Sequence, residues 1–151
     1  MLYGYARRIM RRFIMERIKY RCGFKYQLAE SYSCMTPIKP DKAVKHEFFT
    51  LSKNGKLWIK QGYAWDGASG PTFDTKSSMR PSLVHDAFCQ MMRSRMIDYD
   101  KWQDTVNEFF KHQCVDDGMS AIRASLWHAA VEFANAGHPD QGESNPIQEA
   151  P

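Results

Sequence analysis

The sequence predicts a mixed α+β domain with an amino-terminal helix, a small antiparallel sheet that contains a hairpin, and three carboxyl-terminal helices. Three observations carry this prediction. Aromatic and apolar residues in short runs fill residues 24–59, an Asn-Gly pair lies between two of these runs, and apolar residues recur at spacings of three and four after residue 80. The 151 residues, 43% hydrophobic and 25% charged, suit one globular domain with its own core.

Residues 1–21 are predicted to form a basic amphipathic helix. Apolar residues recur at helical spacing within residues 3–20, namely Ile9, Met10, Phe13, Ile14 and Ile18. Residues 1–21 hold seven Lys/Arg and one acidic residue, a net charge of +6 in a chain whose total is +4. Such a helix packs on its own domain with its basic side in water, or contacts an anionic membrane or a protein partner. Nucleic-acid binding is not expected, because the rest of the chain offers no second basic patch.

The central part of the chain predicts strands and a loop. Residues 24–34 have strand-like content, and residues 48–51 and 56–59 flank Ser52-Lys53-Asn54-Gly55. An Asn-Gly pair tolerates the positive φ angles of a tight turn, so a β-hairpin is predicted here. Residues 62–80 hold three glycines, three serines and one proline and show no helical period, so they are predicted to be a long loop.

Three helices are predicted to follow. The first begins near Pro81 and ends near Arg93. The second begins after the N-cap Asp98 and ends near Cys114, and the third runs from about Ser120 to Gly137. The third helix is expected to bury the stripe Ile122, Leu126, Ala129 and Phe133. Residues 138–151 carry acids and prolines without Lys or Arg, so we expect the domain to comprise residues 22–137 and a disordered acidic tail to follow.

The cysteines and the hydropathy predict a cytoplasmic protein. The four cysteines form no C-x-x-C pair and no zinc-type spacing, and arginines interrupt the amino-terminal apolar residues. No run approaches the roughly 20 apolar residues of a membrane span. We therefore expect reduced thiols and an intracellular protein, in peripheral contact with a membrane if the basic helix binds lipid.

The concentrated chemical signal joins the loop Asp66-Gly67-Ala68-Ser69 to the pair His85-Asp86. Carboxylate and carbonyl oxygens are the ligands that calcium prefers, and glycine allows a carbonyl to turn toward a shared point. A calcium site at Asp66 and Gly67 is one interpretation, and Asp86 on the following helix can also point to a metal beside it. An Asp-Gly turn that ends a strand is the other.

His85 is the candidate general base, and its second ring nitrogen needs an orienting acceptor. The second predicted helix offers Asp104 and Asn107. Stepping about 100° per residue from its apolar stripe places Asn107 at the buried edge and Asp104 on the solvent side, so Asn107 is selected. A Cys89–His85 nucleophilic pair is a weaker alternative to a buried reduced cysteine. His112 and His128 are interpreted as surface or packing residues.

The order of these motifs resembles the domain-of-unknown-function family 1353 of tailed phages and prophages. The resemblance rests on residues 62–71, Val84-His85-Asp86, residues 106–110 and Gly118-Met119-Ser120, and covers about residues 24–136. It implies a small phage-type protein in the host cytoplasm, and the family name brings no established activity.

The same loop followed by His-Asp is more distantly similar to short bacterial and fungal phospholipases A2. That likeness implies calcium on Asp66, Gly67 and Asp86, His85 as the base, and Asn107 in the orienting position. In those enzymes the orienting residue is an aspartate, an aromatic residue occupies the position of Cys89, and a cysteine occupies that of Ser82.

Two functional hypotheses follow. The first is a non-catalytic binding or assembly module, whose partner is a host or phage protein, or an anionic membrane surface, reached through the basic helix. This reading is favoured by the amide at position 107, which stabilises an imidazolium less than a carboxylate does. The alternative is a calcium-dependent, phospholipase-type esterase that uses His85 as general base and Asn107 to orient it.

Overall fold

The computed structural model describes residues 20–21, 26–67 and 75–135, and within them the predicted α+β fold is confirmed. The predicted amino-terminal helix and acidic tail lie outside the described residues. The strands are β1 (Tyr20–Arg21), β2 (Tyr26–Leu28), β3 (Tyr32–Met35), β4 (Val44–Lys45), β5 (Phe49–Leu51), β6 (Lys56–Ile59) and β7 (Ala64–Trp65). The helices are α2 (Lys76–Arg93), α3 (Tyr99–Asp116) and α4 (Ala121–Asn135). None of these described helices has the length and apolarity needed to cross a bilayer.

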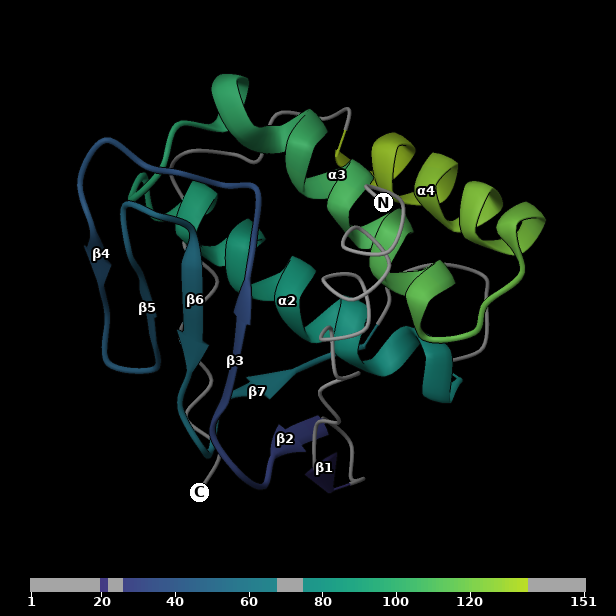
Figure 1. The fold of residues 1–151 in the computed structure, drawn as a ribbon, viewed down its shortest axis with the longest axis horizontal. Coiled ribbons are helices and arrows are strands. Elements are labelled where there is room, and N and C mark those ends of the chain that lie inside the picture. Colours follow the sequence, from purple (N-terminus) through teal and green to yellow (C-terminus); the bar gives the residue numbers. More distant parts are fainter. Residues whose placement is uncertain (1–19, 22–25, 68–74, 136–151) are drawn as a thin grey trace, which may run out of the picture.

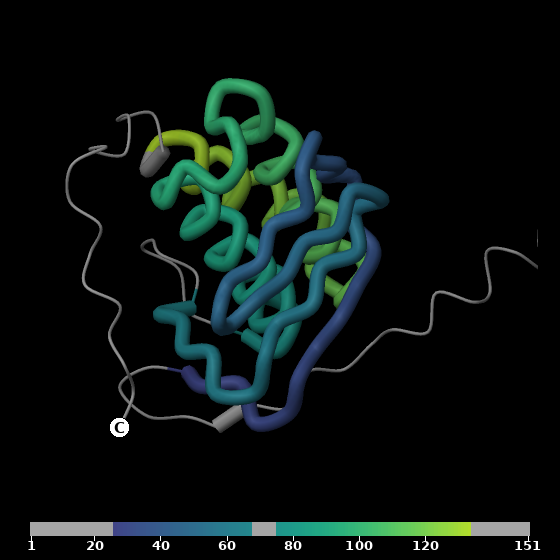
Figure 2. The backbone as a smooth tube through the Cα atoms, turned by 90° about the vertical axis from the view of Figure 1, so that its left-hand side faces the viewer, coloured from purple at the N-terminus to yellow at the C-terminus, as the bar shows by residue number. Residues whose placement is uncertain are grey.

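The described strands form two antiparallel sheets on one side of the helices. One sheet has the order β3-β6-β5-β4 and the other β1-β2-β7. Figure 1 shows α2 between the strands and α3, with α4 packed on α3 at the edge farthest from the four-stranded sheet. Figure 2 shows the strands of this sheet in front of the helices, so the main core lies between a sheet layer and a helical layer.

The predicted hairpin is confirmed as β5 and β6. Leu51 pairs with Leu57 across residues 52–55, and the amide of Gly55 donates to the carbonyl of Ser52 at 3.0 Å. Gly55 has φ +91°, and a Cβ at this position would collide with the Thr36 carbonyl. The turn therefore needs glycine at position 55 for two reasons: its positive φ angle, and the close approach of Thr36, the residue that follows β3.

The predicted long loop of residues 62–80 is wrong at both ends. Ala64 and Trp65 form β7, which pairs with β2. The helix predicted to begin near Pro81 begins at Lys76, because Thr75 and Ser78 form a capping box that satisfies the first-turn backbone. Pro81 lies inside α2, where its missing N–H removes one helical hydrogen bond.

Asp98 caps α3 as predicted, since its carboxylate accepts from the Lys101 amide at 2.8 Å. The helix continues two residues beyond the predicted end, to Asp116. Helix α4 begins where predicted, after Ser120, and its last described residue is Asn135.

The buried face predicted for α4 is wrong. Ile122, Leu126 and Phe133 are 79%, 66% and 87% exposed, and Ala129 is exposed as well. The helix instead buries Ala124, Trp127 and Val131 against α3, in a second core with Phe110, Cys114 and Met119. Both faces of α4 are apolar, so spacing alone could not identify the buried one, and the larger Trp127 gains most from burial.

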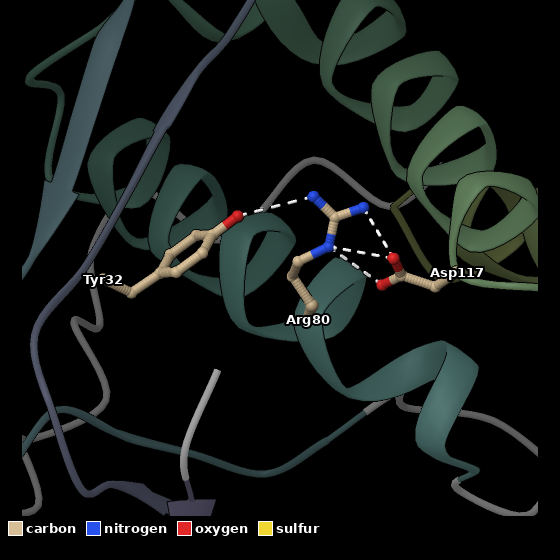
Figure 3. Close-up of polar contacts among 3 residues, drawn as sticks. All are labelled: Tyr32, Arg80 and Asp117. Atoms are coloured by element: carbon tan, nitrogen blue, oxygen red, sulfur yellow. Dashed lines mark hydrogen bonds and ion pairs between the residues drawn. The ribbon is translucent and has the colours of Figure 1, made fainter. Parts of the chain in front are cut away.

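A polar clamp ties α2 to the end of α3. The Arg80 guanidinium donates to both carboxylate oxygens of Asp117, with Nη2 2.7 Å from Oδ1 and Nε 2.9 Å from Oδ2. Its Nη1 also lies 3.5 Å from the Tyr32 hydroxyl of β3 (Figure 3). These contacts set the position of the first half of α2, which leads to His85.

Candidate functional site

The end of β7 brings the Asp66 loop beside α2. The Trp65 ring is buried, and its Nε1 donates to Ser82 Oγ at 3.0 Å, which fixes β7 against the helix. The backbone N–H of Asp66 hydrogen-bonds to the carboxylate of Asp86, one turn farther along α2. The two aspartates selected from the sequence are therefore neighbours, with Asp66 exposed and Asp86 half-buried.

Gly67 has φ +79°, a left-handed conformation that glycine adopts without strain. Ala68 and Ser69, which complete the predicted loop motif, lie outside the described residues. This turn of the backbone at Gly67 comes immediately after the exposed side chain of Asp66.

The surroundings of Asp86 favour its protonated form. Burial raises the pKa of this carboxyl to about 7; His85 and Arg93 oppose the rise, the negative charge of Asp66 adds to it, and the Asp66 N–H opposes it. A desolvated carboxylate beside a second carboxylate costs free energy when both are charged. A bound cation would relieve this cost.

The His85 side chain of α2 meets Asn107 of α3. Its Nε2 lies 3.0 Å from Asn107 Oδ1, and Asn107 is 1% exposed whereas Asp104 lies in solvent. An amide oxygen accepts a hydrogen bond, so this contact places the ring proton on Nε2 and the lone pair on Nδ1. Burial lowers the pKa of His85, which keeps the ring neutral, while the bond to Asn107 acts in the opposite direction.

Cys89 lies against the face of the same ring. Its sulfur is 3.6 Å from Nδ1 and 3.9 Å from Nε2, nearly the same distance from both. A partner in line with the Nδ1 lone pair would lie much farther from Nε2, so the sulfur is above the ring and not at the end of a hydrogen bond. Burial raises the pKa of the Cys89 thiol to about 12, which disfavours a thiolate nucleophile.

Two residues near Asp86 were not selected from the sequence. The Tyr63 hydroxyl donates to Gln90 Oε1 at 3.1 Å, and burial followed by the charge of Asp86 raises the pKa of Tyr63. Arg93 lowers the pKa of both Asp86 and Cys89 through its positive charge. Its spacing of seven from Asp86, which returns to the same side of a helix, is a signal that could have identified Arg93.

The donors at this site fit a hard cation in part. Asp66 and Asp86 supply carboxylate oxygens, the ligand type that calcium takes. Within residues 20–21, 26–67 and 75–135, no group of three or more His, Cys, Asp or Glu side chains could hold a metal ion. A calcium ion would therefore need carbonyl and water oxygens to complete its shell.

The remaining histidines of the helices lie apart from this site. His112 is exposed on α3, as interpreted from the sequence. His128 of α4 lies between two carboxylates, with Nε2 3.1 Å from Glu108 and Nδ1 3.6 Å from Glu132, and so helps to pack α4 on α3.

The comparisons with known proteins add no identity. No protein-family model, no curated protein and no solved structure matches this chain. The resemblances to the phage family and to phospholipase A2 therefore stay predictions, and the site is interpreted from its own geometry.

Proposed function

We propose that the chain is a small phage-type hydrolase in which His85 is the general base of ester hydrolysis. The observation that supports this most is the 3.0 Å contact between His85 Nε2 and Asn107 Oδ1, which leaves Nδ1 as the basic nitrogen. An oriented, neutral imidazole with one basic nitrogen is what proton abstraction from water requires. The half-buried carboxylate of the adjacent residue, Asp86, would supply a calcium ligand beside this base.

In this mechanism Nδ1 of His85 takes a proton from water while the water oxygen attacks the ester carbonyl carbon. The ester C–O bond then breaks, and the proton on Nδ1 passes to the leaving alkoxide. Asn107 holds the ring through both transfers by accepting from Nε2. Calcium held by Asp66, Asp86 and the carbonyl of Gly67 would stabilise the negative charge that develops on the carbonyl oxygen.

A neutral acceptor at position 107 has a consequence for the rate. An aspartate would stabilise the imidazolium that forms during the reaction, and an amide does so less. The proposed enzyme is therefore slow compared with one that carries a carboxylate here. Its ester substrate would be a phospholipid or a smaller ester.

A non-catalytic binding or assembly module is the second candidate, and the enclosure of His85 favours it. The Cys89 sulfur covers the ring, the Phe110 ring centroid lies 5.2 Å away, and His85 is 9% exposed. In this reading the site is structural, and the basic residues 1–21 contact a host or phage protein or an anionic membrane surface.

One experiment separates the two candidates. Ester and phospholipid hydrolysis would be measured with calcium for the intact chain, for His85→Ala and for His112→Ala, which changes an exposed histidine of α3. The hydrolase proposal expects turnover that is lost in His85→Ala and kept in His112→Ala. The binding-module candidate expects no turnover in any of them, and binding of anionic vesicles or a host protein that is lost on deletion of residues 1–19.

A further inference from the structure

The outer face of α4 is an apolar stripe that the other described residues leave exposed. It consists of Ile122, Leu126, Ala129 and Phe133. Stepping about 100° per residue places this stripe opposite Trp127, which α4 buries against α3. Because α4 is also the outermost of the described helices (Figure 1), its outer face is open to a partner that approaches from the side away from α3.

The spacing of the stripe is that of a helix–helix seam. Its four residues are separated by four, three and four positions, the alternation that the a and d positions of a coiled coil show. Side chains at this spacing form one narrow line along a helix, and they pack between the side chains of a second helix that carries the same pattern. The stripe therefore fits a helix as its partner.

We propose that this helix is α4 of a second copy of the chain, packed in antiparallel orientation about a twofold axis. Such a contact uses the same surface of both copies, so the stripe must be complementary to itself. The proposal is independent of any activity at His85.

The sequence of the stripe meets this requirement. Its midpoint lies between positions 127 and 128, with Ile122 and Phe133 equally far from it on either side, and Leu126 and Ala129 equally far as well. An antiparallel pair centred there places Ile122 level with Phe133 of the second copy, and the large Leu126 level with the small Ala129. A parallel pair would place Ala129 level with Ala129 and leave a gap, so the side-chain sizes favour the antiparallel orientation.

The charges of α4 favour the same orientation. Arg123 and Glu132 are the Lys, Arg, Asp and Glu residues of this helix, and they flank the stripe on opposite sides, each about 90° from its centre. In the antiparallel pair Glu132 lies level with Arg123 of the second copy, nine residues from the second Glu132, which is about 13 Å along the axis. A parallel pair would bring the two Glu132 side chains level, with like charges facing each other.

Other occupants of the stripe lack a matching feature. A helix that lies on an anionic membrane surrounds its apolar face with Lys and Arg, whereas α4 offers Arg123 and an opposing Glu132. Residues 138–151, which follow α4, contain Ile147 as their one large apolar residue. Strand β1, to which residues 1–19 connect, lies at the end of the molecule away from α4 (Figure 1).

Analytical ultracentrifugation of the full chain tests the proposal, from about 1 μM to about 1 mM, the range in which small interfaces associate. We expect a monomer–dimer equilibrium whose Kd rises at least about 100-fold in Leu126→Asp, because a twofold interface loses this apolar contact twice. Met35→Asp is the matched control, since Met35 of β3 is 53% exposed and lies outside α4. It should leave the Kd unchanged, and circular dichroism would verify that both variants fold.

Disulfide cross-linking tests the orientation. Ile122→Cys mixed with Phe133→Cys should form a disulfide between the two chains under mild oxidation, whereas each variant alone should not exceed the background that the native cysteines give in the wild type. Cross-linking of each variant with itself, and not in the mixture, would show a parallel pair and overturn the proposal.

Three further results would also overturn it. One is a monomer at every concentration, and another is a dimer that Leu126→Asp does not weaken, which would place the contact on another surface. The third is a monomer that binds phosphatidylcholine vesicles and loses this binding in Leu126→Asp, which would assign the stripe to a lipid surface.

Discussion

Nε2 of His85 on α2 lies 3.0 Å from Oδ1 of Asn107 on α3, so a buried amide and not a carboxylate orients the imidazole. The contact joins two long helices that pack directly on each other. It determines which ring nitrogen carries the proton, and therefore which one is basic.

Replacing Asn107 tests how this contact controls the basicity of His85. Asn107→Asp should raise the pKa of His85 by about 1 unit or more, because a negative neighbour favours the imidazolium. It should also increase ester hydrolysis if His85 is the base. Asn107→Leu removes the acceptor and should lower both. The pKa is measured by NMR titration of the imidazole. Asp104→Asn, a substitution of a solvent-exposed residue on the same helix, is the control. A faster Asn107→Leu variant would be inconsistent with the orienting role.

Asp86 should make stability depend on pH. The pKa of Asp86 is raised from 3.8 to about 7 in the folded state. The contribution of this carboxyl to the free energy of unfolding is therefore fully present below pH 3.8 and is lost as the pH rises through about 7. Asp86→Asn stays neutral, so its stability relative to the wild type should increase across this window. Urea unfolding at several pH values measures the difference. A constant offset between the two proteins would show that Asp86 ionises normally.

The Arg80–Asp117 clamp should contribute more to stability than an exposed ion pair. Side chains of both residues are 14% exposed, so Asp117→Asn leaves a guanidinium without its charged partner and should cost about 2 kcal/mol. Lys101 and Asp41 form the control pair at 3.4 Å, with side chains 50% and 89% exposed. Asp41→Asn should cost less than about 0.5 kcal/mol in the same denaturant titration. Similar losses of stability in the two variants would contradict the idea that burial makes the Arg80–Asp117 pair the stronger one.

Gly55 and Gly118 distinguish two reasons why a position requires glycine, a positive φ angle and a lack of space for a Cβ. Both have positive φ, +91° and +95°, but a Cβ on Gly55 meets the Thr36 carbonyl while a Cβ on Gly118 meets nothing within 4 Å. Gly118→Ala should cost about 1 kcal/mol from the dihedral angle alone. Gly55→Ala should cost clearly more, because backbone must also move. Thermal unfolding of the two variants measures the difference between their stability costs. Equal costs would mean that the backbone around Gly55 moves to accommodate a Cβ without strain.

Local signals made much of the fold predictable. Asn54-Gly55 identified the hairpin, Asp98 identified the start of α3, and the helical phase of Asn107 separated it from Asp104. Each of these features depends on residues close together in sequence, so the relevant physics is visible in a short window.

The errors came from features that depend on distant residues. The burial of Trp127 rather than Leu126 depends on α3, which the periodicity of α4 cannot reveal. Likewise β7 forms only because β2 lies beside it. The early start of α2 is a different kind of error, because Thr75 and Ser78 form their capping box only three residues apart, and this local signal before Pro81 was missed. The proximity of Asp66 to Asp86 was suggested by a resemblance, and periodicity gave no distance between them.

We propose that Asp66, Asp86 and His85 form one hydrolytic site that uses calcium. The most direct measurement is calcium calorimetry on the intact chain, on Asp66→Asn and Asp86→Asn, and on the exposed control Asp104→Asn, followed by ester hydrolysis under the same conditions. We expect calcium binding that is lost in Asp66→Asn and Asp86→Asn and kept in Asp104→Asn, and hydrolysis that requires both calcium and His85. Absence of binding in the intact chain, or binding unaffected by both site variants, would contradict it.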